Sequence, residues 1–295
     1  MKDCKSPGEA AHELNKKIFK LLGVRYSTKR NRADQAPAET IETGLASCTG
    51  LSILLVDACR SVGVPARLAG TPNWVNKSGN HTWVEVWDGG WHFAGAAEPD
   101  SRGLDHGWFQ GRAAQAIEDS PEHAIYATSF RKTGTSFPLV WAPGVDYVSA
   151  VNVTRRYVPA GARPSEKPRL RVRVLEGKGG DRVVRSVELI DRDDLEKVLR
   201  GKSRDESNDT NDILTFKVDK GRAYELRVMD GDRVLSREYR CGGERQDVIS
   251  IFLTRPSPRK LKKAEEEKLS RALKGYFSAD EKKRAGWKFS RSLDK

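Results

Sequence analysis

The sequence has few cysteines and no long apolar run, and each shortage excludes a class of protein. No stretch of about 18 consecutive apolar residues occurs in the 295 residues, which argues against a membrane-spanning helix. The N-terminal residues carry charges without the apolar stretch of a secretory signal, so the default expectation is a cytoplasmic protein, unless this is a processed or truncated exported one. Only four cysteines occur, without a CxxC pair, so a disulfide scaffold is not expected.

Signatures of metal and phosphate binding are also missing. His92, His106 and His123 show no ligand spacing with one another or with a cysteine, so we expect no metal site. The Asp and Asn residues of 205–212 lack the glycine and the final glutamate of a calcium loop. We therefore interpret Arg192–Asn211 as a solvated polar insertion. Because no phosphate-binding glycine loop occurs either, no cofactor is expected.

The positive charge is concentrated at the C-terminal end. Residues 255–295 contain 14 Lys and Arg against 6 Asp and Glu, a surplus of eight within the net charge of +12. Arg259–Lys263 could bind the phosphates of a nucleic acid, with Trp287 as a stacking surface. However, Glu265–Glu267 interrupts the basic run and forms i,i+4 pairs, which favours a solvated helical extension. Nucleic acid is therefore an unlikely partner for this chain.

The first half of the chain mixes helices and strands. Ser6-Pro7-Gly8-Glu9 is a helix start, with a capping Ser and a Pro in the first turn, and Gly23 ends the predicted helix. A second helix is predicted for 49–62, and because apolar residues surround nearly all of it, we place it at the centre of a domain. Strands are predicted to start at Val64 and to cover 81–87 and 91–97, with a tight turn between the last two.

From about Tyr147 the sequence changes to short alternating strands, which predicts a β-sandwich. The predicted class is therefore α+β, with an enzyme-like domain at 1–145, a β-sandwich at 146–255 and a basic helical extension at 256–295. The seven predicted strands are 149–157, 169–175, 183–190, 213–218, 224–230, 233–239 and 248–253.

Cys48 is the first candidate for chemistry, because it lies where the apolar helix begins. The unpaired amides and the positive end of the helix dipole would stabilise a thiolate there, and the same amides could hold an oxyanion. The alternative is a small buried apolar residue at a junction between loop and helix.

His81 is the candidate base, because it starts a strand at the open edge of the predicted sheet. If Gly89-Gly90 is a two-residue turn, His81 faces Glu98, whose carboxylate would hold the imidazole as a triad does. Asp100 has the same parity one step further on. The alternative for His81 is a surface or core histidine with a single hydrogen bond.

Taken in order, these motifs resemble the transglutaminase-like superfamily. The resemblance covers Leu14 to Asp100 well and extends plausibly to Trp141. It is carried by Gly44-Leu45-Ala46-Ser47-Cys48, Gly63-Val64-Pro65-Ala66-Arg67, His81-Thr82-Trp83-Val84-Glu85-Val86, Trp91 and Glu98-Pro99.

The resemblance implies a papain-like α+β domain with a Cys–His–Asp triad, in which Cys48 matches the nucleophile and His81 the base. The third member departs from the family pattern, since the fourth residue after Trp91 is Gly95 rather than Asp. Glu98-Pro99 resembles the family's Asp-Pro pair three positions later, so Glu98 is favoured over Asp100.

The resemblance also implies a thiol enzyme that acts on amide bonds of proteins or peptides through an acyl-enzyme. Because no calcium signature is present, a peptidase or amidase is favoured over a cross-linking enzyme. The alternative is an inactive transglutaminase-like protein that binds its partner in an aromatic cleft. Trp74, Trp83 and Trp108 are the candidate substrate-binding residues, and they could equally fill a core.

Overall fold

The computed structural model describes residues 4–159, 167–242 and 246–253. These residues belong to one compact unit, Met1–Leu253. The predicted basic helical extension at 256–295 lies outside the described residues. None of the helices in the described part is both long and apolar enough to cross a membrane.

Three helices form the first layer, and two of them were expected from the sequence. Helix α1 (Pro7–Leu21) begins at the predicted cap, where the Ser6 hydroxyl accepts a hydrogen bond from the Glu9 amide at 3.2 Å. Helix α3 (Cys48–Ser61) begins one residue before the predicted start. Helix α2 (Pro37–Thr43) lies in a segment without an expected element; Gly44 ends it at φ +66°, a conformation that favours glycine.

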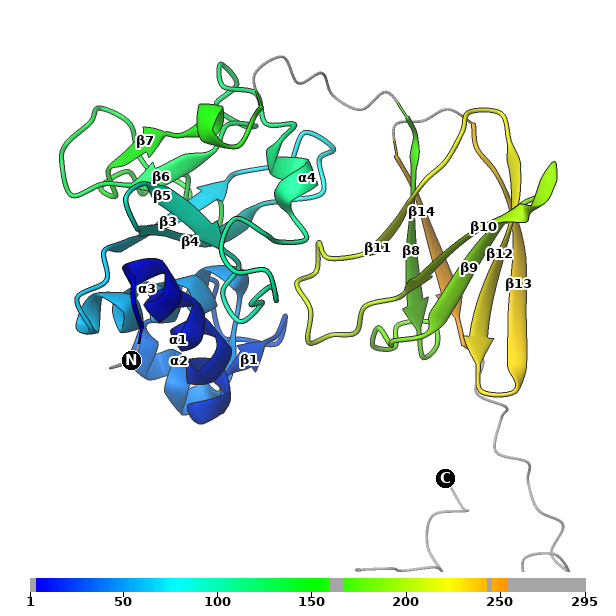
Figure 1. Cartoon of the computed structure of the whole chain (residues 1–295), viewed down its shortest axis with the longest axis horizontal. Coiled ribbons are helices and arrows are strands. Elements are labelled where there is room, and N and C mark those ends of the chain that lie inside the picture. Colours follow the sequence, from blue (N-terminus) through cyan, green and yellow to red (C-terminus); the bar gives the residue numbers. More distant parts are fainter. Residues whose placement is uncertain (1–3, 160–166, 243–245, 254–295) are drawn as a thin grey trace, which may run out of the picture. The chain divides into compact units, whose positions relative to one another are not determined.

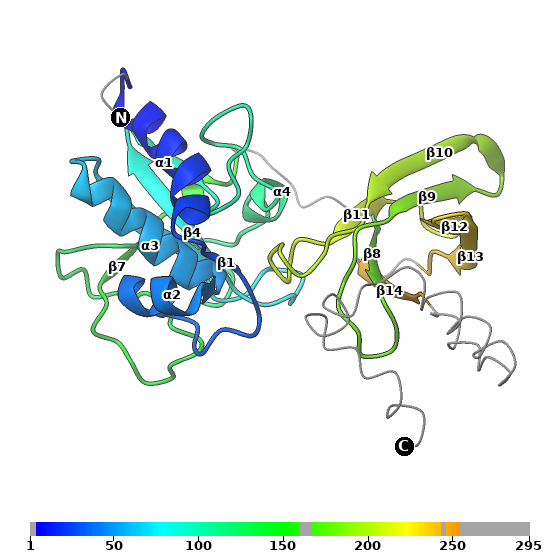
Figure 2. The same ribbon diagram turned by 90° about the horizontal axis from the view of Figure 1, so that it is seen from below.

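The second layer is a five-stranded antiparallel sheet that carries His81. Its strand order is β5-β4-β3-β6-β7, and Figures 1 and 2 show the helices on one side of it. Val84 and Val86 on β4 share a core with Leu51, Leu54 and other residues of α3. The other face buries an aromatic core around Trp83. The strands are β3 (Ala66–Thr71), β4 (His81–Trp87), β5 (Trp91–Ala94), β6 (Tyr126–Thr128) and β7 (Ala150–Asn152), and the short segments β1 (Arg25–Tyr26), β2 (Leu45–Ala46), α4 (Gln110–Ala113) and η1 (Thr154–Arg156) complete this part.

The register between β4 and β5 differs from the predicted one. Trp87 pairs with Trp91, so the turn contains three residues, 88–90, rather than two. A slip by one position exchanges the two faces of a strand. Strand β5 also ends at Ala94, before it reaches the level of His81. The predicted cross-strand pair between His81 and Glu98 is therefore wrong.

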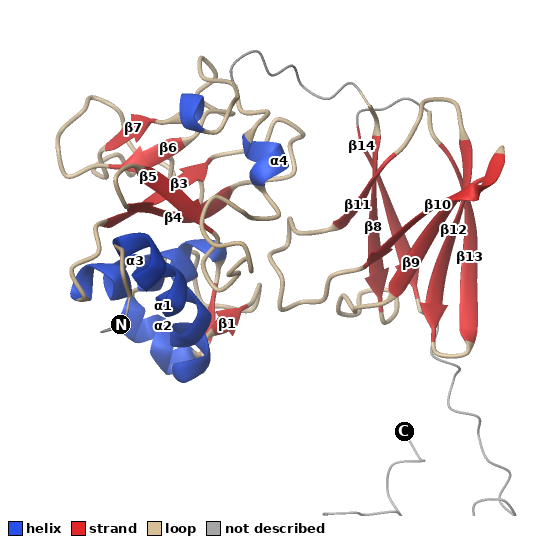
Figure 3. Ribbon diagram, in the orientation of Figure 1, coloured by secondary structure: helices blue, strands red, loops and turns tan. Residues whose placement is uncertain are grey.

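The remaining strands form two sheets around a second core, as Figure 3 shows. One sheet has the order β10-β9-β12-β13 and the other β11-β8-β14. Leu170, Leu189 and Leu226, from strands of both sheets, are fully buried in the shared core. The strands are β8 (Arg169–Leu175), β9 (Ser186–Asp191), β10 (Asp194–Lys202), β11 (Leu214–Lys217), β12 (Ala223–Asp230), β13 (Arg233–Arg240) and β14 (Gln246–Phe252).

Two strands of the structure differ from the strands predicted from the sequence. The predicted strand at 149–157 is the short β7, which pairs with β6 in the His81 sheet and not with the second core. Strand β10, which the sequence did not predict, occupies much of the predicted polar insertion 192–211 and pairs with β9 in a sheet around the second core. Its charged side chains are mostly exposed, which hides the alternating pattern of a strand. The domain boundary near residue 145 stays a prediction.

Candidate active site

The start of α3 positions Cys48. The Ser47 hydroxyl accepts hydrogen bonds from the amides of Thr49 and Gly50, at 3.0 and 3.1 Å, and so fixes the first turn. Thr49 Oγ1 also lies 3.0 Å from Thr82 Oγ1 on β4. These bonds hold the first turn of α3 against the beginning of β4, where His81 lies.

Aromatic side chains surround His81, which is 2% exposed. The centroid of its ring lies 4.8 Å from that of Trp108 and 5.0 Å from that of Phe109. Trp74 and Trp83 follow at 6.0 and 5.8 Å. The imidazole therefore has little freedom to rotate away from Cys48.

The third member of the group, Asp209, comes from the segment between β10 and β11. Its side chain is buried although the sequence predicts a solvated loop. The segment is anchored on both sides of Asp209: the Thr210 amide donates to Tyr26 Oη at 3.0 Å, and Asn211 Nδ2 donates to the Asn80 carbonyl at 3.0 Å. Arg182 donates to the carbonyl oxygens of residues 208, 209 and 212. The segment is thus a built structure and not a solvated loop.

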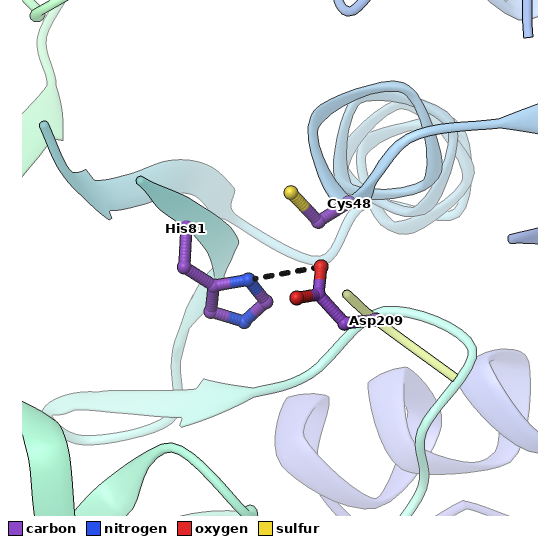
Figure 4. A group of neighbouring side chains, drawn as sticks. All are labelled: Cys48, His81 and Asp209. Atoms are coloured by element: carbon purple, nitrogen blue, oxygen red, sulfur yellow. Dashed lines mark ion pairs between the residues drawn. The ribbon is translucent and has the colours of Figure 1, made fainter. Parts of the chain in front are cut away.

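Figure 4 shows how Cys48, His81 and Asp209 converge. One donor atom from each of the three lies within 4.8 Å of the other two. Asp209 Oδ2 is 3.5 Å from His81 Nδ1, which is long for a hydrogen bond. In the figure, Nδ1 is on the edge of the ring that faces both Asp209 and Cys48, and the other ring nitrogen is on the far edge. The carboxylate therefore lies beside the nucleophile, and not behind the base as in a triad.

This arrangement keeps the thiol of Cys48 protonated. Burial raises the pKa of Cys48 well above its ordinary value, and the negative charge of Asp209 raises it further. A hydrogen bond from the Thr82 backbone acts in the opposite direction but is outweighed. The position at the helix start therefore does not produce the expected thiolate in this state.

Asp209 itself carries the negative charge. Burial alone would raise the pKa of its carboxyl group. The charge of His81 and hydrogen bonds from the Asn211 amide and the Cys48 thiol outweigh this, so the pKa of Asp209 lies below its ordinary value. The same three side chains offer sulfur, nitrogen and oxygen donors at a separation that a metal ion could also use.

Glu98 lies close to this group without joining it. Its Oε2 accepts a hydrogen bond from Trp108 Nε1 at 2.7 Å. Burial and then the charge of Asp209 raise the pKa of Glu98 to about 8. Among the described residues, no hydrogen bond or ion pair joins Glu98 to His81. The role of Glu98 as the third triad member stays a prediction, and the structure places it as a neutral acid next to Trp108.

Asp100 and two of the three tryptophans are occupied elsewhere. Asp100 forms a two-pronged pair with Arg102, both contacts at 2.8 Å, so it does not reach the group. Trp74 and Trp83 are 2% and 0% exposed and stack on each other in the core behind His81, and neither is among the residues that line the cavity beside Cys48. Trp108 does line a cavity, together with several arginine side chains.

A cavity of about 410 Å³ opens beside Cys48. Its lining includes Tyr26, Trp141, Asp209 and the 78–80 turn. Trp141, which the sequence did not single out, places an aromatic wall next to the thiol. The cavity is large enough for a few side chains of a peptide.

Asp209 is the functional candidate that sequence reasoning missed. It lies 128 positions after His81, beyond any spacing that a strand or a turn could have suggested. The available signal was the cluster Asn208-Asp209-Thr210-Asn211-Asp212, which is short-chained and polar within a segment otherwise rich in longer charged residues. From the sequence alone, this cluster is interpreted as part of a solvated loop, because it lacks the signature of a calcium loop.

Comparisons with curated proteins and with solved structures add no argument about this chain. None of the curated proteins matches the chain. Among solved structures, the crystal structure of the group B streptococcus pilus 2b backbone protein is similar over 64% of this chain and 78% of that chain. The identity is 12% and the TM-score 0.22, so this similarity carries no argument about the fold.

The family comparison is specific to the start of the chain. Residues 1–96 match the transglutaminase-like superfamily, and this match includes Cys48 and His81 but neither Glu98 nor Asp209. A match of this kind with a Cys48–His81–Asp209 group suggests a cysteine enzyme. The resemblance seen in the sequence is confirmed: residues 1–96 match the family model of the transglutaminase-like superfamily.

Proposed function

We propose that the protein is a cysteine enzyme that cleaves amide bonds of proteins or peptides through an acyl-enzyme on Cys48. The observation that carries this proposal is the convergence of the Cys48 sulfur and the His81 ring at the start of a buried helix, within the transglutaminase-like segment. A thiol and an imidazole at this separation can share a proton once the carbonyl group of a substrate enters the site.

In the acylation step, the Cys48 thiol gives its proton to His81 and the sulfur attacks the carbonyl carbon of the amide. The resulting oxyanion can accept a hydrogen bond from the Cys48 amide, since the Ser47 hydroxyl caps Thr49 and Gly50 instead. The carbon–nitrogen bond then breaks, and protonated His81 gives its proton to the leaving amine. A thioester on Cys48 remains.

The second step depends on the acceptor. When water attacks the thioester, His81 takes the proton from the water, the carbon–sulfur bond breaks, and the thiol and a carboxylic acid are released. When a primary amine attacks, the product is a new amide. We favour water, because the sequence lacks the calcium signature of cross-linking enzymes.

The test compares hydrolysis and transfer on one substrate. An amine-reactive dye added to casein after the reaction reports new amino termini, and casein with a fluorescent primary amine reports transfer. We expect hydrolysis by the wild type, no turnover by Cys48→Ala, and a loss of about 10²–10⁴ in rate for His81→Ala. Cys59→Ala is the matched control, because Cys59 is a buried cysteine on the same helix. Turnover that survives in Cys48→Ala would contradict the proposal.

A second candidate is a binding protein without turnover. It is favoured by the position of Asp209, which lies close to the Cys48 thiol and adds to the effect of burial in raising the pKa of that thiol. This candidate predicts retention of casein peptides by the wild type and by Cys48→Ala alike, with no new amino termini in either sample.

A further inference from the structure

A second cavity, of about 290 Å³, has an unusual balance of charge. Four arginines line it, Arg112, Arg169, Arg171 and Arg204, together with a single carboxylate, that of Asp212. Trp108 forms part of the same wall, and its ring contacts that of His81. The cavity is therefore adjacent to the candidate active site.

The arginine side chains are held in place by the protein. The guanidinium of Arg112 lies over the Trp108 ring, 5.1 Å from its centroid, and donates to the Asn211 carbonyl at 2.7 Å. Arg171 is only 5% exposed and donates to the same carbonyl at 3.2 Å. Arg204 binds Asp212 at 3.0 Å. This cluster is consequently a built site and not a solvated charged surface.

Positive charge exceeds negative charge in the lining of this cavity, which has four arginines and the carboxylate of Asp212. Burial, together with the charges of Arg112 and Arg173, lowers the pKa of Arg171 to about 9. Burial lowers the pKa of Arg112 to about 10 as well. Guanidinium groups that are buried close together are destabilising unless negative charge balances them, and they bind carboxylates in a planar, two-pronged manner.

The segment 209–212 indicates which anion fits. Asp209 lies at Cys48 and His81, and Asp212, three positions later, lies in the arginine cavity. The Asp212 amide donates a hydrogen bond to the Asp209 carbonyl at 2.9 Å, so a single turn of the chain joins the two positions. A peptide that follows a similar course would place an acidic side chain in the cavity when it presents its amide to Cys48.

We infer that Arg112, Arg169, Arg171 and Arg204 form a subsite for a carboxylate of an acidic peptide substrate, about three residues from the amide that reacts. This inference rests on the proposed function only in that it calls the bound peptide a substrate. Binding itself can be measured without turnover. Its failure therefore remains distinguishable from that of the catalytic proposal.

The experiment measures binding to the full chain carrying Cys48→Ala. Two fluorescent peptides of equal length are compared by anisotropy, one with aspartates and one with asparagines at the same positions. We expect the acidic peptide to bind at least tenfold more tightly, and Arg169→Gln, a half-buried position that should tolerate the change, to remove most of this difference. Arg173→Gln is the matched control, since Arg173 is on the same strand, exposed and outside the cavity.

Three results would overturn the inference. The first is equal affinity for the two peptides, and the second is an equal loss in Arg169→Gln and Arg173→Gln, which would indicate attraction by net charge only. The third is displacement of the acidic peptide by inorganic phosphate at a concentration below the peptide's own Kd, which would make the cavity a phosphate site.

A separate observation supports a second inference, about regulation. The Asp209 carboxylate contacts both reacting groups, the Cys48 thiol and His81 Nδ1, on the edge of the ring where a substrate carbonyl would have to enter. The geometry points to an autoinhibitory role: the segment 208–212 closes the site in the resting chain and leaves before a substrate binds.

Alkylation of Cys48 by iodoacetamide at neutral pH tests this role. Removing the carboxylate in Asp209→Ala should accelerate alkylation at least tenfold, because the negative charge no longer opposes the thiolate. Thr210→Ala, which loosens the anchor on Tyr26 but keeps the charge, should accelerate it less. A triad acid would behave in the opposite way, so slower or unchanged alkylation in Asp209→Ala would overturn the inference. EDTA in all samples removes metal ions as a competing cause.

Discussion

At the scale of single residues, two carboxyl groups near one thiol hold opposite charge states. Asp209 is stabilised as a carboxylate by His81, whereas burial and the charge of Asp209 raise the pKa of Glu98 to about 8. The two groups are coupled, because the negative charge of one opposes ionisation of the other. At neutral pH the carboxyl group of Glu98 is therefore protonated, and it accepts a hydrogen bond from Trp108.

The raised pKa of Glu98 predicts how stability depends on pH. Its folded-state pKa of about 8 exceeds the ordinary value of 4.5, so the folded protein keeps a proton that the unfolded chain has lost. The contribution of Glu98 to the free energy of unfolding is therefore greatest below about pH 4.5 and falls until about pH 8. Relative to Glu98→Gln, the wild type should lose stability across this range in urea unfolding.

Glu225 provides the control for this measurement. Hydrogen bonds from Arg227 and Ser236 lower its pKa to about 2, so its contribution to stability is complete above about pH 4.5 and is lost only in acid. The stability difference between the wild type and Glu225→Gln should stay flat between about pH 5 and 8. A flat difference for Glu98→Gln as well would show that Glu98 ionises normally in the folded protein.

At the scale of elements, strand β4 connects the site to the core. Thr82 and Val84 face helix α3, and His81 and Glu85 face the aromatic core on the opposite side. Glu85 is 1% exposed and is paired with Arg67 at 2.6 Å, with Arg156 at 3.2 Å and with the hydroxyl of Tyr157 at 2.8 Å. This buried network fixes the strand that starts with the candidate base.

Removal of the Glu85 carboxylate should therefore destabilise the protein strongly. Glu85→Ala leaves Arg67 without its partner in a buried position, and breaking a buried pair in this way costs about 3–5 kcal/mol. Glu188→Ala, which removes the largely exposed pair with Arg200, should cost less than about 1 kcal/mol. Urea unfolding measures both values. A similar small cost for the two variants would mean that Arg67 finds another partner.

The elements also show where the sequence was sufficient. The bounds of β4 and the start of α1 were predicted correctly, because alternation and capping are local signals. The turn at 88–90 was counted as two residues instead of three, since both loops suit Asp-Gly-Gly. That single error moved the predicted partner of His81 to Glu98. Register depends on contacts that the local sequence does not specify.

At the scale of the whole molecule, the candidate site depends on residues that are far apart in the sequence. Cys48 and His81 lie within the transglutaminase-like segment, and their convergence was predicted from motif order. Asp209 and the arginines of β8 come from the strand-rich part. The alternation of arginines with apolar residues in Arg169–Val174 predicts a strand with one polar face, but it cannot predict what that face contacts.

The anchor of the segment 208–212 gives a last prediction. The Thr210 amide and hydroxyl both use Tyr26 Oη, and Tyr26→Phe removes this partner. Each of these two part-buried hydrogen bonds contributes about 0.5–1.5 kcal/mol, so the loss of both costs about 1–3 kcal/mol. Opening of the segment should therefore become about 5- to 150-fold more frequent, and exchange of the Thr210 amide with deuterium, followed by mass spectrometry, should accelerate by the same factor.

Tyr126→Phe is the matched control, because the Tyr126 hydroxyl donates to the Pro121 carbonyl, away from this segment. If the segment closes the site, Cys48 alkylation should accelerate in Tyr26→Phe in proportion to the exchange of the Thr210 amide, and both rates should stay unchanged in Tyr126→Phe. Faster exchange without faster alkylation would separate the two events. Opening of the segment would then not expose Cys48, and the sulfur would have to be reached by another path through the cavity that Trp141 lines.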